Sequence, residues 1–326
     1  MKKKKTRILL DTNVWSYIAD QEAVSAVAQA ARARSVEIVV TPSLVDELRR
    51  ISDTTLRRKA LQTITHPAWT RLMPEIYDEC LELKAEIKRL RPEWVIASPK
   101  LTEVNRLRYD WIRRTGGFWD RARVDLAPRR TDESRRSDKE LDLARKEARE
   151  IRNRVFQSGE QNGAVSLQHV AYILEEPTPG WSGDPVQYWR ASSLFFIVKE
   201  LMVYTSPIRE WMDSELDVFA ILAQTESTNH LWLHELDPCN VPRQWLRGAF
   251  EFLQSWHKVT DGTPGDSAIS TNLIDADFVV SADKNFINFA NRCHTEAPFR
   301  TAKGIRVAGG AHAIPDLLTA ILDAEK

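Results

Sequence analysis

Residues 7–20 read RILLDTNVWSYIAD, and this stretch decides the fold of the chain. Its apolar run at residues 8–10 is short and uninterrupted, as expected for a buried strand of a parallel sheet. The run ends at Asp11, and Asn13 stands two residues later. Residues 14–33 are rich in alanine and space their apolar side chains as one face of a helix does. A buried strand that passes through a carboxylate into a helix predicts an α/β protein.

A second unit of the same kind follows directly. Residues 37–40 (EIVV) form another apolar run, which ends at Thr41 and Pro42. Ser43 is the candidate N-cap of the next helix, whose apolar side carries leucine and valine. Two strands that alternate with two helices indicate a parallel sheet, because parallel neighbours need a crossover connection between them.

The same alternation returns near the end of the chain. Residues 278–281 (FVVS) and 305–307 (IRV) are expected to be strands, and residues 242–257 and 314–322 are expected to be helices. The run HLWLHEL at residues 230–236 is interpreted as a further strand. One sheet is therefore predicted to combine strands from both ends of the chain.

The middle of the chain has a different character, because its apolar spacing is mainly helical and no pair of strands stands out. The predicted helices are 76–90, 141–156, 194–203 and 214–223, and the predicted loops are 126–140 and 175–185. We therefore predict a discontinuous α/β domain at residues 1–51 and 228–326. Residues 52–227 are predicted to form a large helical insert that binds substrate or a partner.

The composition argues against several classes of protein. Lysine and arginine total 46, as do aspartate and glutamate, so the overall charge attracts no polyanion. Cys80, Cys239 and Cys293 lie far apart, which argues against a disulfide scaffold and fits a reducing compartment. The basic start MKKKK precedes too short an apolar run for a signal peptide, and no apolar run approaches the length of a membrane span. We expect a cytoplasmic protein without a membrane partner.

Four carboxylates occupy comparable positions in this pattern. Asp11 and Asp283 each follow a buried strand, Glu47 lies on the helix after the second strand, and Asp266 opens a helix after the turn DGTPG. Ligands of open parallel sheets bind beyond the carboxyl ends of the strands, where we expect the four to meet. Gathered carboxylates without basic partners favour a hard cation such as Mg²⁺ or Mn²⁺. Two such ions can activate water and stabilise the leaving oxygen of a phosphodiester.

Three segments carry these acids: ILLDTNVW, TPSLVDEL and GDSAISTNLIDADFVVSADKNF. In this order they resemble the motifs of PIN-domain nucleases. The resemblance implies an α/β/α sandwich with a central parallel sheet, divalent metal, and endonuclease activity, most often on RNA. It implies that Asp11, Asp266 and Asp283 ligate the metal and that Glu47 ligates metal or orients water. Asn13 and Ser281 would support these ligands.

Each acid also has a structural interpretation. Asp11 and Asp266 are suited to cap the helices beside them, and a helical glutamate such as Glu47 often lies on a solvated face. Asp275 and Asp277 are interpreted as turn residues. The histidines are interpreted as packed or surface residues, since hydrolysis with two metal ions needs none. They are His230, His234, His257 and His312.

The predicted insert contains a stretch, residues 106–130, that combines arginine with aromatic residues. The combination suits single-stranded nucleic acid, through phosphate contacts and base stacking. Alternatively, the aromatic residues belong to the core and the arginines pair with neighbouring aspartates. Both interpretations stay open from sequence. The candidate nucleic-acid-binding residues are Arg106, Arg108, Arg113, Arg114, Arg121 and Arg123.

The resulting hypothesis is a PIN-like endonuclease with two Mg²⁺ or Mn²⁺ ions, of the toxin, defence or RNA-processing type. Its expected partners are nucleic acid, RNA before DNA, and a regulatory protein or a second copy of the chain. One alternative is a PIN-like scaffold that binds a partner with little catalysis. Another is a haloacid-dehalogenase-like phosphohydrolase, which has a similar first aspartate but a second aspartate where this chain has Asn13.

Overall fold

The structure is a computed structural model of the chain. It describes residues 5–113, 115–127, 165–257 and 263–324, together with residues 143, 146, 149, 150 and 153. Most of the predicted loop at 126–140, most of the predicted helix at 141–156, and Arg114 lie outside the described residues. The start of the turn DGTPG lies outside them as well.

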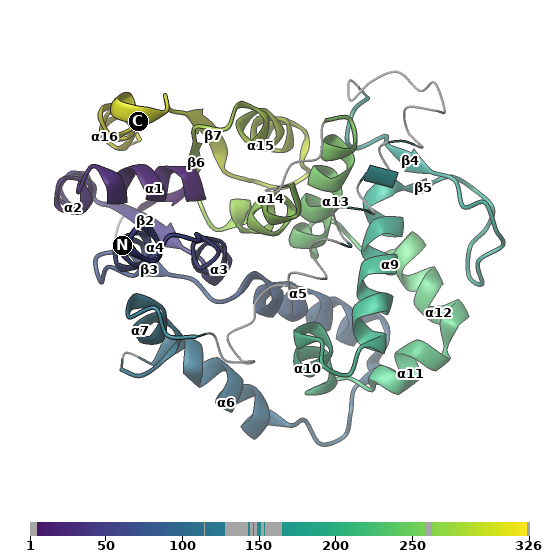
Figure 1. Cartoon of the computed structure of the whole chain (residues 1–326). Coiled ribbons are helices and arrows are strands. Elements are labelled where there is room, and N and C mark those ends of the chain that lie inside the picture. The colour runs from purple at the N-terminus through teal and green to yellow at the C-terminus, as the bar shows by residue number, and fades with distance from the viewer. Residues whose placement is uncertain are drawn as a thin grey trace.

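A five-stranded parallel sheet forms the centre of the fold, as predicted (Figure 1). Its order is β3-β2-β1-β6-β7, so the first strand of the chain is the middle strand of the sheet. Leu9 pairs with Val39 on one side and with Val279 on the other, which joins the two ends of the chain. The strands are β1 (Thr6–Leu10), β2 (Val36–Val40), β3 (Thr70–Arg71), β6 (Phe278–Ser281) and β7 (Lys303–Arg306).

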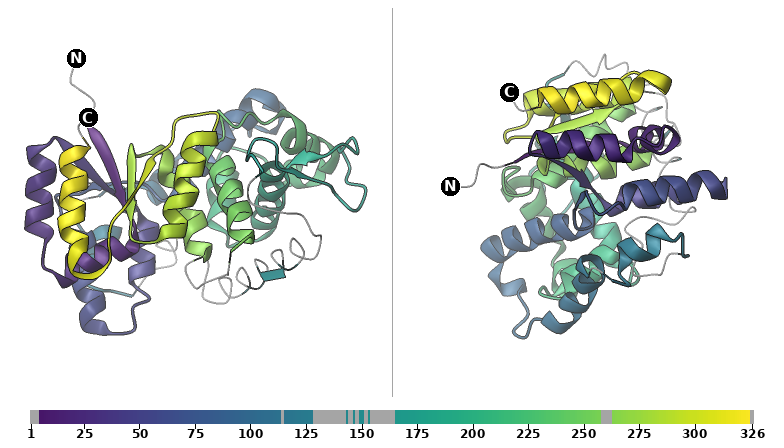
Figure 2. Two further views of the ribbon diagram at one scale, coloured as in Figure 1. Left: turned by 90° about the horizontal axis from the view of Figure 1, so that it is seen from above. Right: turned by 90° about the vertical axis from the view of Figure 1, so that its left-hand side faces the viewer.

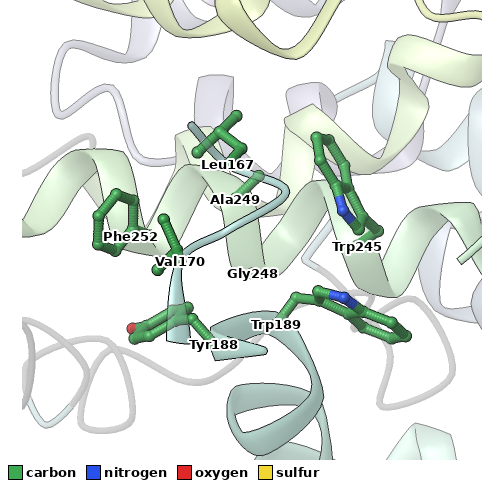
Figure 3. Close-up of a pocket in the computed structure, with 8 residues that line it drawn as sticks. All are labelled: Leu167, Val170, Tyr188, Trp189, Trp245, Gly248, Ala249 and Phe252. Atoms are coloured by element: carbon green, nitrogen blue, oxygen red, sulfur yellow. The ribbon is translucent and has the colours of Figure 1, made fainter. Parts of the chain in front are cut away.

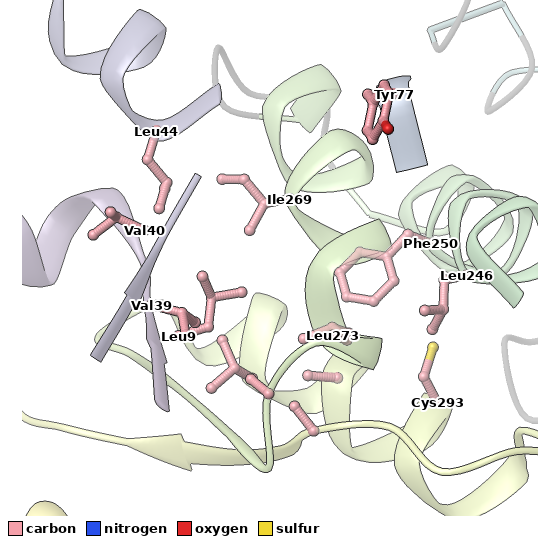
Figure 4. Packing of buried hydrophobic residues seen from close by; sticks show 14 of the residues in the cluster. Leu9, Val39, Val40, Leu44, Tyr77, Leu246, Phe250, Ile269, Leu273 and Cys293 are labelled. Carbon is pink, nitrogen blue, oxygen red and sulfur yellow. The ribbon is translucent and has the colours of Figure 1, made fainter. Parts of the chain in front are cut away.

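Helices cover both faces of this sheet. On one side, α16 from the C-terminal end packs beside α1 and α2, and α15 lies on the other side against β6 and β7 (Figure 2). Fully buried Leu9, Val39, Leu44 and Ile269 point toward one another in the core (Figure 4). The helices nearest the sheet are α1 (Thr12–Asp20), α2 (Val24–Ala33), α3 (Pro42–Leu48), α4 (Thr54–Ile64), α14 (Thr263–Ser270), η4 (Thr271–Ile274), α15 (Lys284–Glu296), η5 (Gly310–His312) and α16 (Ala313–Asp323).

The rest of the described chain is mainly helical, as the sequence predicted for the middle segment. Its helices are α5 (Glu75–Leu90), η1 (Pro92–Trp94), α6 (Leu101–Ile112), α7 (Phe118–Arg123), α9 (Tyr188–Met202), α10 (Pro207–Asp213), α11 (Val218–Ala223), α12 (Thr225–His230), η3 (Leu231–Glu235) and α13 (Pro242–Ser255). The short strands β4 (Ala171–Tyr172) and β5 (Val186–Gln187) form an antiparallel pair where we expected none.

Helix α13 connects the helical part to the sheet, since it packs against α5 and α9 as well as α14 and α15. It carries buried charges: Arg247 pairs with Glu79 of α5, and Arg243 bonds both oxygens of Asp275 at 2.9 and 3.0 Å. Gly248 lets α9 approach closely, because a Cβ there would lie 2.7 Å from the Cα of Trp189. A small apolar pocket lies beside this crossing (Figure 3).

Several predicted elements differ from the structure. Residues 14–33 form two helices, since α1 ends at Asp20 and Glu22 adopts a positive φ of 54°. The N-cap of α3 is Thr41, whose side chain accepts from the Ser43 N–H. The predicted strand at residues 230–236 is absent: His230 ends α12, and Leu231–Glu235 continue it as the π-helix η3.

The segment that we assigned to the insert also contributes to the sheet. Strand β3 pairs in parallel with β2, although residues 70–71 lie beyond the predicted boundary at residue 51. In the same segment, the apolar stretch at residues 214–223 becomes helical only from Val218. The division into two domains stays a prediction.

Candidate active site at the carboxyl edge of the sheet

The predicted site lies where the strand order reverses. Strands β2 and β3 lie on one side of β1, and β6 and β7 lie on the other. Such a switch point opens a crevice at the carboxyl ends of the strands, where ligands of α/β sheets bind. Asp11 directly follows β1, and its N–H donates to the Val280 carbonyl at 3.0 Å. Ser281 is the last residue of β6.

The carboxylate of Asp11 is held by three donors. Its Oδ2 accepts from the Ser281 hydroxyl and from the Asn13 amide, both at 2.6 Å. Its Oδ1 accepts from the Thr12 N–H at 2.7 Å, which makes Asp11 the N-cap of α1. The capping role that we weighed against a site role is therefore real, and the two coexist. Only 7% of Asp11 is exposed, so its position is fixed by the fold.

The two predicted supporting residues tie the strand ends together. The Ser281 side chain is fully buried, and its hydroxyl accepts from the Asp283 N–H at 2.9 Å. The Asn13 amide donates to the same hydroxyl at 3.0 Å and accepts from the Ala282 N–H at 3.1 Å. These bonds join α1 to the turn after β6 and bring Asp283 to the same edge as Asp11.

Glu47 reaches this group through a residue that sequence reasoning missed. The Thr12 hydroxyl donates to Glu47 Oε2 at 2.7 Å, and the Thr12 N–H donates to Asp11. One residue thus contacts both acids. Thr12 stands between two residues that we singled out, but a sequence gives no sign of which distant side chain its hydroxyl meets. Helix α3 presents Glu47 after the N-cap Thr41.

Burial and like charges act together on Asp11. Its pKa is raised from 3.8 to about 6: burial raises it most, the negative charges of Glu47 and Asp283 also raise it, and the bonds from Ser281 and Thr12 partly oppose the rise. Glu47 and Asp283 thus lie near enough to Asp11 for their charges to act on it. Asp283 itself is exposed and caps α15, accepting from the N–H groups of Asn285 and Phe286.

Asp266 lies near the start of a helix, as the sequence predicted. Helix α14 begins at Thr263, so Asp266 is in its first turn and partly buried. This helix packs against α3, which carries Glu47. It is also anchored to α13, since the Ser267 hydroxyl donates to Gln254 Oε1 at 2.7 Å. The place of Asp266 among the other acids stays a prediction.

Among the residues that the structure describes, no group of three or more His, Cys, Asp and Glu side chains is arranged to hold a metal ion. The chemistry of the donors nevertheless fits a divalent cation. Asp11 is a buried carboxylate, and both charges that shift its pKa in the described structure are negative. A hard cation with oxygen ligands would balance this charge.

The arginines of residues 106–123 divide into two kinds. Arg121 is buried and forms a bidentate pair with Asp110, which also pairs with Arg113 at 2.8 Å. Arg106 and Arg108 are exposed on α6, and Arg123 is partly exposed on α7. Of the aromatic residues in this stretch, Trp111, Phe118 and Trp119 are buried, whereas Tyr109 is exposed.

Comparison of the chain with protein-family models, curated proteins and solved structures finds no match. Its function must therefore be argued from its own residues. In the described part of the chain, no helix is both long enough and apolar enough to cross a bilayer.

Proposed function

We propose that the protein is a divalent-metal-dependent endonuclease with a PIN-like domain, and that it hydrolyses phosphodiester bonds in RNA. The observation that carries the proposal is the environment of Asp11. A buried carboxylate is fixed by Ser281 and Asn13 at the switch point of the sheet, beside Glu47 and Asp283. The choice of RNA rests on the resemblance of the motifs to PIN-domain nucleases.

In this proposal Asp11, Asp266 and Asp283 hold Mg²⁺ or Mn²⁺, and Glu47 holds metal or orients water. Two bound ions supply an activated water and positive charge at the leaving oxygen. The side chains of the protein orient two of these carboxylates. Ser281 and Asn13 fix one oxygen of Asp11, and Thr12 fixes one oxygen of Glu47, so both carboxylates are oriented before substrate arrives.

The geometry of Asn13 argues against the phosphohydrolase alternative. That chemistry needs an acid two residues after the nucleophilic aspartate to protonate the leaving group. Here the amide of Asn13 donates to Asp11 and accepts from the Ala282 N–H, so it holds Asp11 and the turn after β6 in position. An amide has no acidic proton to deliver at neutral pH.

A cleavage assay tests the proposal. End-labelled single-stranded RNA, hairpin RNA, single-stranded DNA and double-stranded DNA are incubated with the protein plus Mn²⁺ or EDTA. We expect cutting of RNA with Mn²⁺, none with EDTA, and none by Asp11→Asn or Asp266→Asn. Asp20→Asn is the matched control, because Asp20 is exposed at the far end of α1.

Two outcomes would overturn the proposal. Cleavage that survives in Asp11→Asn would show that the site lies elsewhere or that a contaminant cuts. No cleavage of any substrate, with no heat of Mn²⁺ binding in calorimetry, would favour the scaffold that binds a partner. Cutting of DNA alone would correct the substrate while leaving the metal site in place.

A further inference from the structure

Arg71 is the last residue of β3, an outermost strand of the sheet, so it lies at the carboxyl ends of the strands, as the acids do. Val39 pairs with Leu9 on one side and Thr70 on the other, so Arg71 is level with Leu10, the residue before Asp11. The two residues are separated by one intervening strand, β2. With strands about 4.8 Å apart, their backbones lie about 10 Å apart. A stacked single strand covers this distance in about three nucleotides, at 3.4 Å each.

A second arginine converges on Arg71 from α7. Arg71 Nη2 donates to the Thr65 carbonyl at 3.3 Å, and Arg123 Nη2 donates to the same oxygen. The guanidinium of Arg71 lies over the ring of Trp119, 5.3 Å from its centroid, and Trp119 is buried. Both arginines are partly exposed. The Thr65 carbonyl therefore binds both guanidinium groups, and the Trp119 ring supports that of Arg71, so two positive charges lie side by side.

The electrostatics show that these like charges act on each other. Burial lowers the pKa of Arg71, and the charge of Arg123 lowers it further, while Asp120 opposes the change. Burial and the charge of Arg123 likewise lower the pKa of His66. Guanidinium groups stay charged at any physiological pH, so a bound anion would reduce a repulsion that Asp120 offsets only in part.

The surrounding segment is rich in basic residues, although acids outside it pair with four of them: Asp46 with Arg49, Asp125 with Arg57 and Arg58, and Glu22 with Lys59. Residues 49–71 contain six lysines and arginines but one acid, Asp53, in a chain whose total charge is zero. This segment runs from the end of α3, directly after Glu47, through α4 to Arg71. The segment thus links the helix that carries Glu47 to Arg71 on the β3 side of the sheet.

We propose that Arg71 and Arg123 bind a backbone phosphate of a single-stranded nucleic acid, a few nucleotides from the bond that is cut. Planar guanidinium groups match phosphate oxygens, and two converging ones can bind a single phosphate. The cutting site is the one in the proposed function, on which this placement rests. The binding itself does not depend on it.

A structural role is the alternative for the same pair. Thr65 is the C-cap of α4, and basic side chains stabilise the free carbonyls at a helix end. Removal of a capping arginine would lower stability and leave nucleic-acid affinity unchanged. Removal of a phosphate ligand would lower affinity and reduce its dependence on salt.

Fluorescence anisotropy separates these roles. A labelled 12-nucleotide single-stranded RNA, and the DNA of the same sequence, are titrated with protein in EDTA, so that no cleavage occurs. The variants are Arg71→Gln, Arg123→Gln and Arg71→Lys. The matched control is Arg32→Gln with Arg34→Gln. Arg32 lies in the last turn of α2 and Arg34 directly follows the helix, so these exposed arginines are at the opposite, amino-terminal end of the strands.

We expect each glutamine variant to bind about tenfold more weakly, as for the loss of one charge-assisted hydrogen bond. The slope of log K against log salt should fall by about 0.7 for each lost phosphate contact. Arg71→Lys should keep the slope, because it keeps the charge. The control should bind as the wild type does, and a thermal melt verifies that each variant is folded.

Wild-type affinity and slope in both glutamine variants, for RNA and DNA alike, would overturn the proposal. So would a loss no greater than that of the Arg32 and Arg34 control. The proposed nuclease can fail separately, since it is judged by cleavage in Mn²⁺ and by Asp11→Asn. If the nuclease is correct, Arg71→Gln should raise KM and leave kcat and Mn²⁺ affinity close to wild type.

Discussion

Replacing Asp11 by asparagine should make the metal-free protein more stable. The carboxylate of Asp11 is buried beside the charges of Glu47 and Asp283, and its pKa rises from 3.8 to about 6. Each pKa unit corresponds to about 1.4 kcal/mol, so the charged form costs the folded state about 3 kcal/mol at neutral pH. Asparagine removes the charge but offers one acceptor oxygen where Asp11 offers two, so at least one of the donors Thr12, Ser281 and Asn13 loses its acceptor. That loss costs about 1–3 kcal/mol, so the net gain should be at most about 2 kcal/mol.

The pH dependence gives the sign of the effect. Above pH 6 Asp11 is charged in both the folded and the unfolded states, and the full cost is present. Between pH 6 and 3.8 the folded state binds the proton first, so the cost falls as the pH falls. The advantage of Asp11→Asn should therefore be largest at pH 7–8, smaller at pH 5, and absent below pH 3.8.

Urea denaturation in EDTA, followed by tryptophan fluorescence at pH 7.5 and 5, measures this difference. The control is Asp20→Asn on the same helix, where the residue is exposed and the change should stay below about 0.5 kcal/mol. Adding Mn²⁺ should stabilise the wild type and leave Asp11→Asn unchanged. A variant that is less stable than the wild type at pH 7.5 would refute the reasoning, since the carboxylate would then be a net stabilising group.

Three further substitutions test other parts of the structure. Thr12→Val removes the hydroxyl that holds Glu47, so it should slow cleavage at least tenfold and leave RNA affinity in EDTA unchanged. A cleavage rate equal to that of the wild type and of the control Thr319→Val would contradict this. Gly248→Ala places a methyl group 2.7 Å from the Trp189 Cα and should lower the free energy of unfolding, measured by urea denaturation, by about 1–3 kcal/mol. Gly309→Ala meets only the Tyr17 ring and hydroxyl and should lower it less, so equal losses would argue against close packing of α9 and α13 at Gly248. Arg121→Gln should lower the free energy of unfolding by about 2–3 kcal/mol and leave RNA affinity in EDTA unchanged, because it weakens a buried ion pair with Asp110 that Arg113 replaces only in part. If it is as stable as the control Arg106→Gln, in which an exposed arginine is replaced, Arg121 has no structural role.

The sequence predicted the parts of the fold that bury apolar runs. Strands β1, β2 and β6 are short runs of branched residues, and their helices have regular apolar spacing. Strand β3 was missed because two residues, Thr70 and Arg71, give no periodicity. The run HLWLHEL at residues 230–236 was misleading, since Leu231, Trp232 and Leu233 are all buried in one helical turn.

Some residues of the candidate site could be predicted from the sequence, and others could not. Asp11 was predicted because it follows a buried strand, whereas Asn13 and Ser281 were implied by the resemblance of the motifs to PIN-domain nucleases. The structure joins the three by hydrogen bonds. Thr12 was missed because its partner, Glu47, is 35 residues away. Arg71 was missed because its role depends on β3, on α7 and on the Thr65 carbonyl, none of which a local pattern connects.

The strand order also has a consequence for synthesis of the protein on the ribosome. The middle strand, β1, is made first, yet its neighbour β6 and the Ser281 hydroxyl that binds Asp11 come 270 residues later. At 5–20 residues per second, one edge of β1 therefore waits on the order of ten seconds or more for its partner. During that time the nascent chain has an open apolar strand edge, the kind of surface that chaperones cover and that aggregates form on. An interrupted chain that ends before β6 would carry Asp11 and Glu47 and still lack Ser281, so the proposed nuclease would have no complete site until its translation is nearly finished.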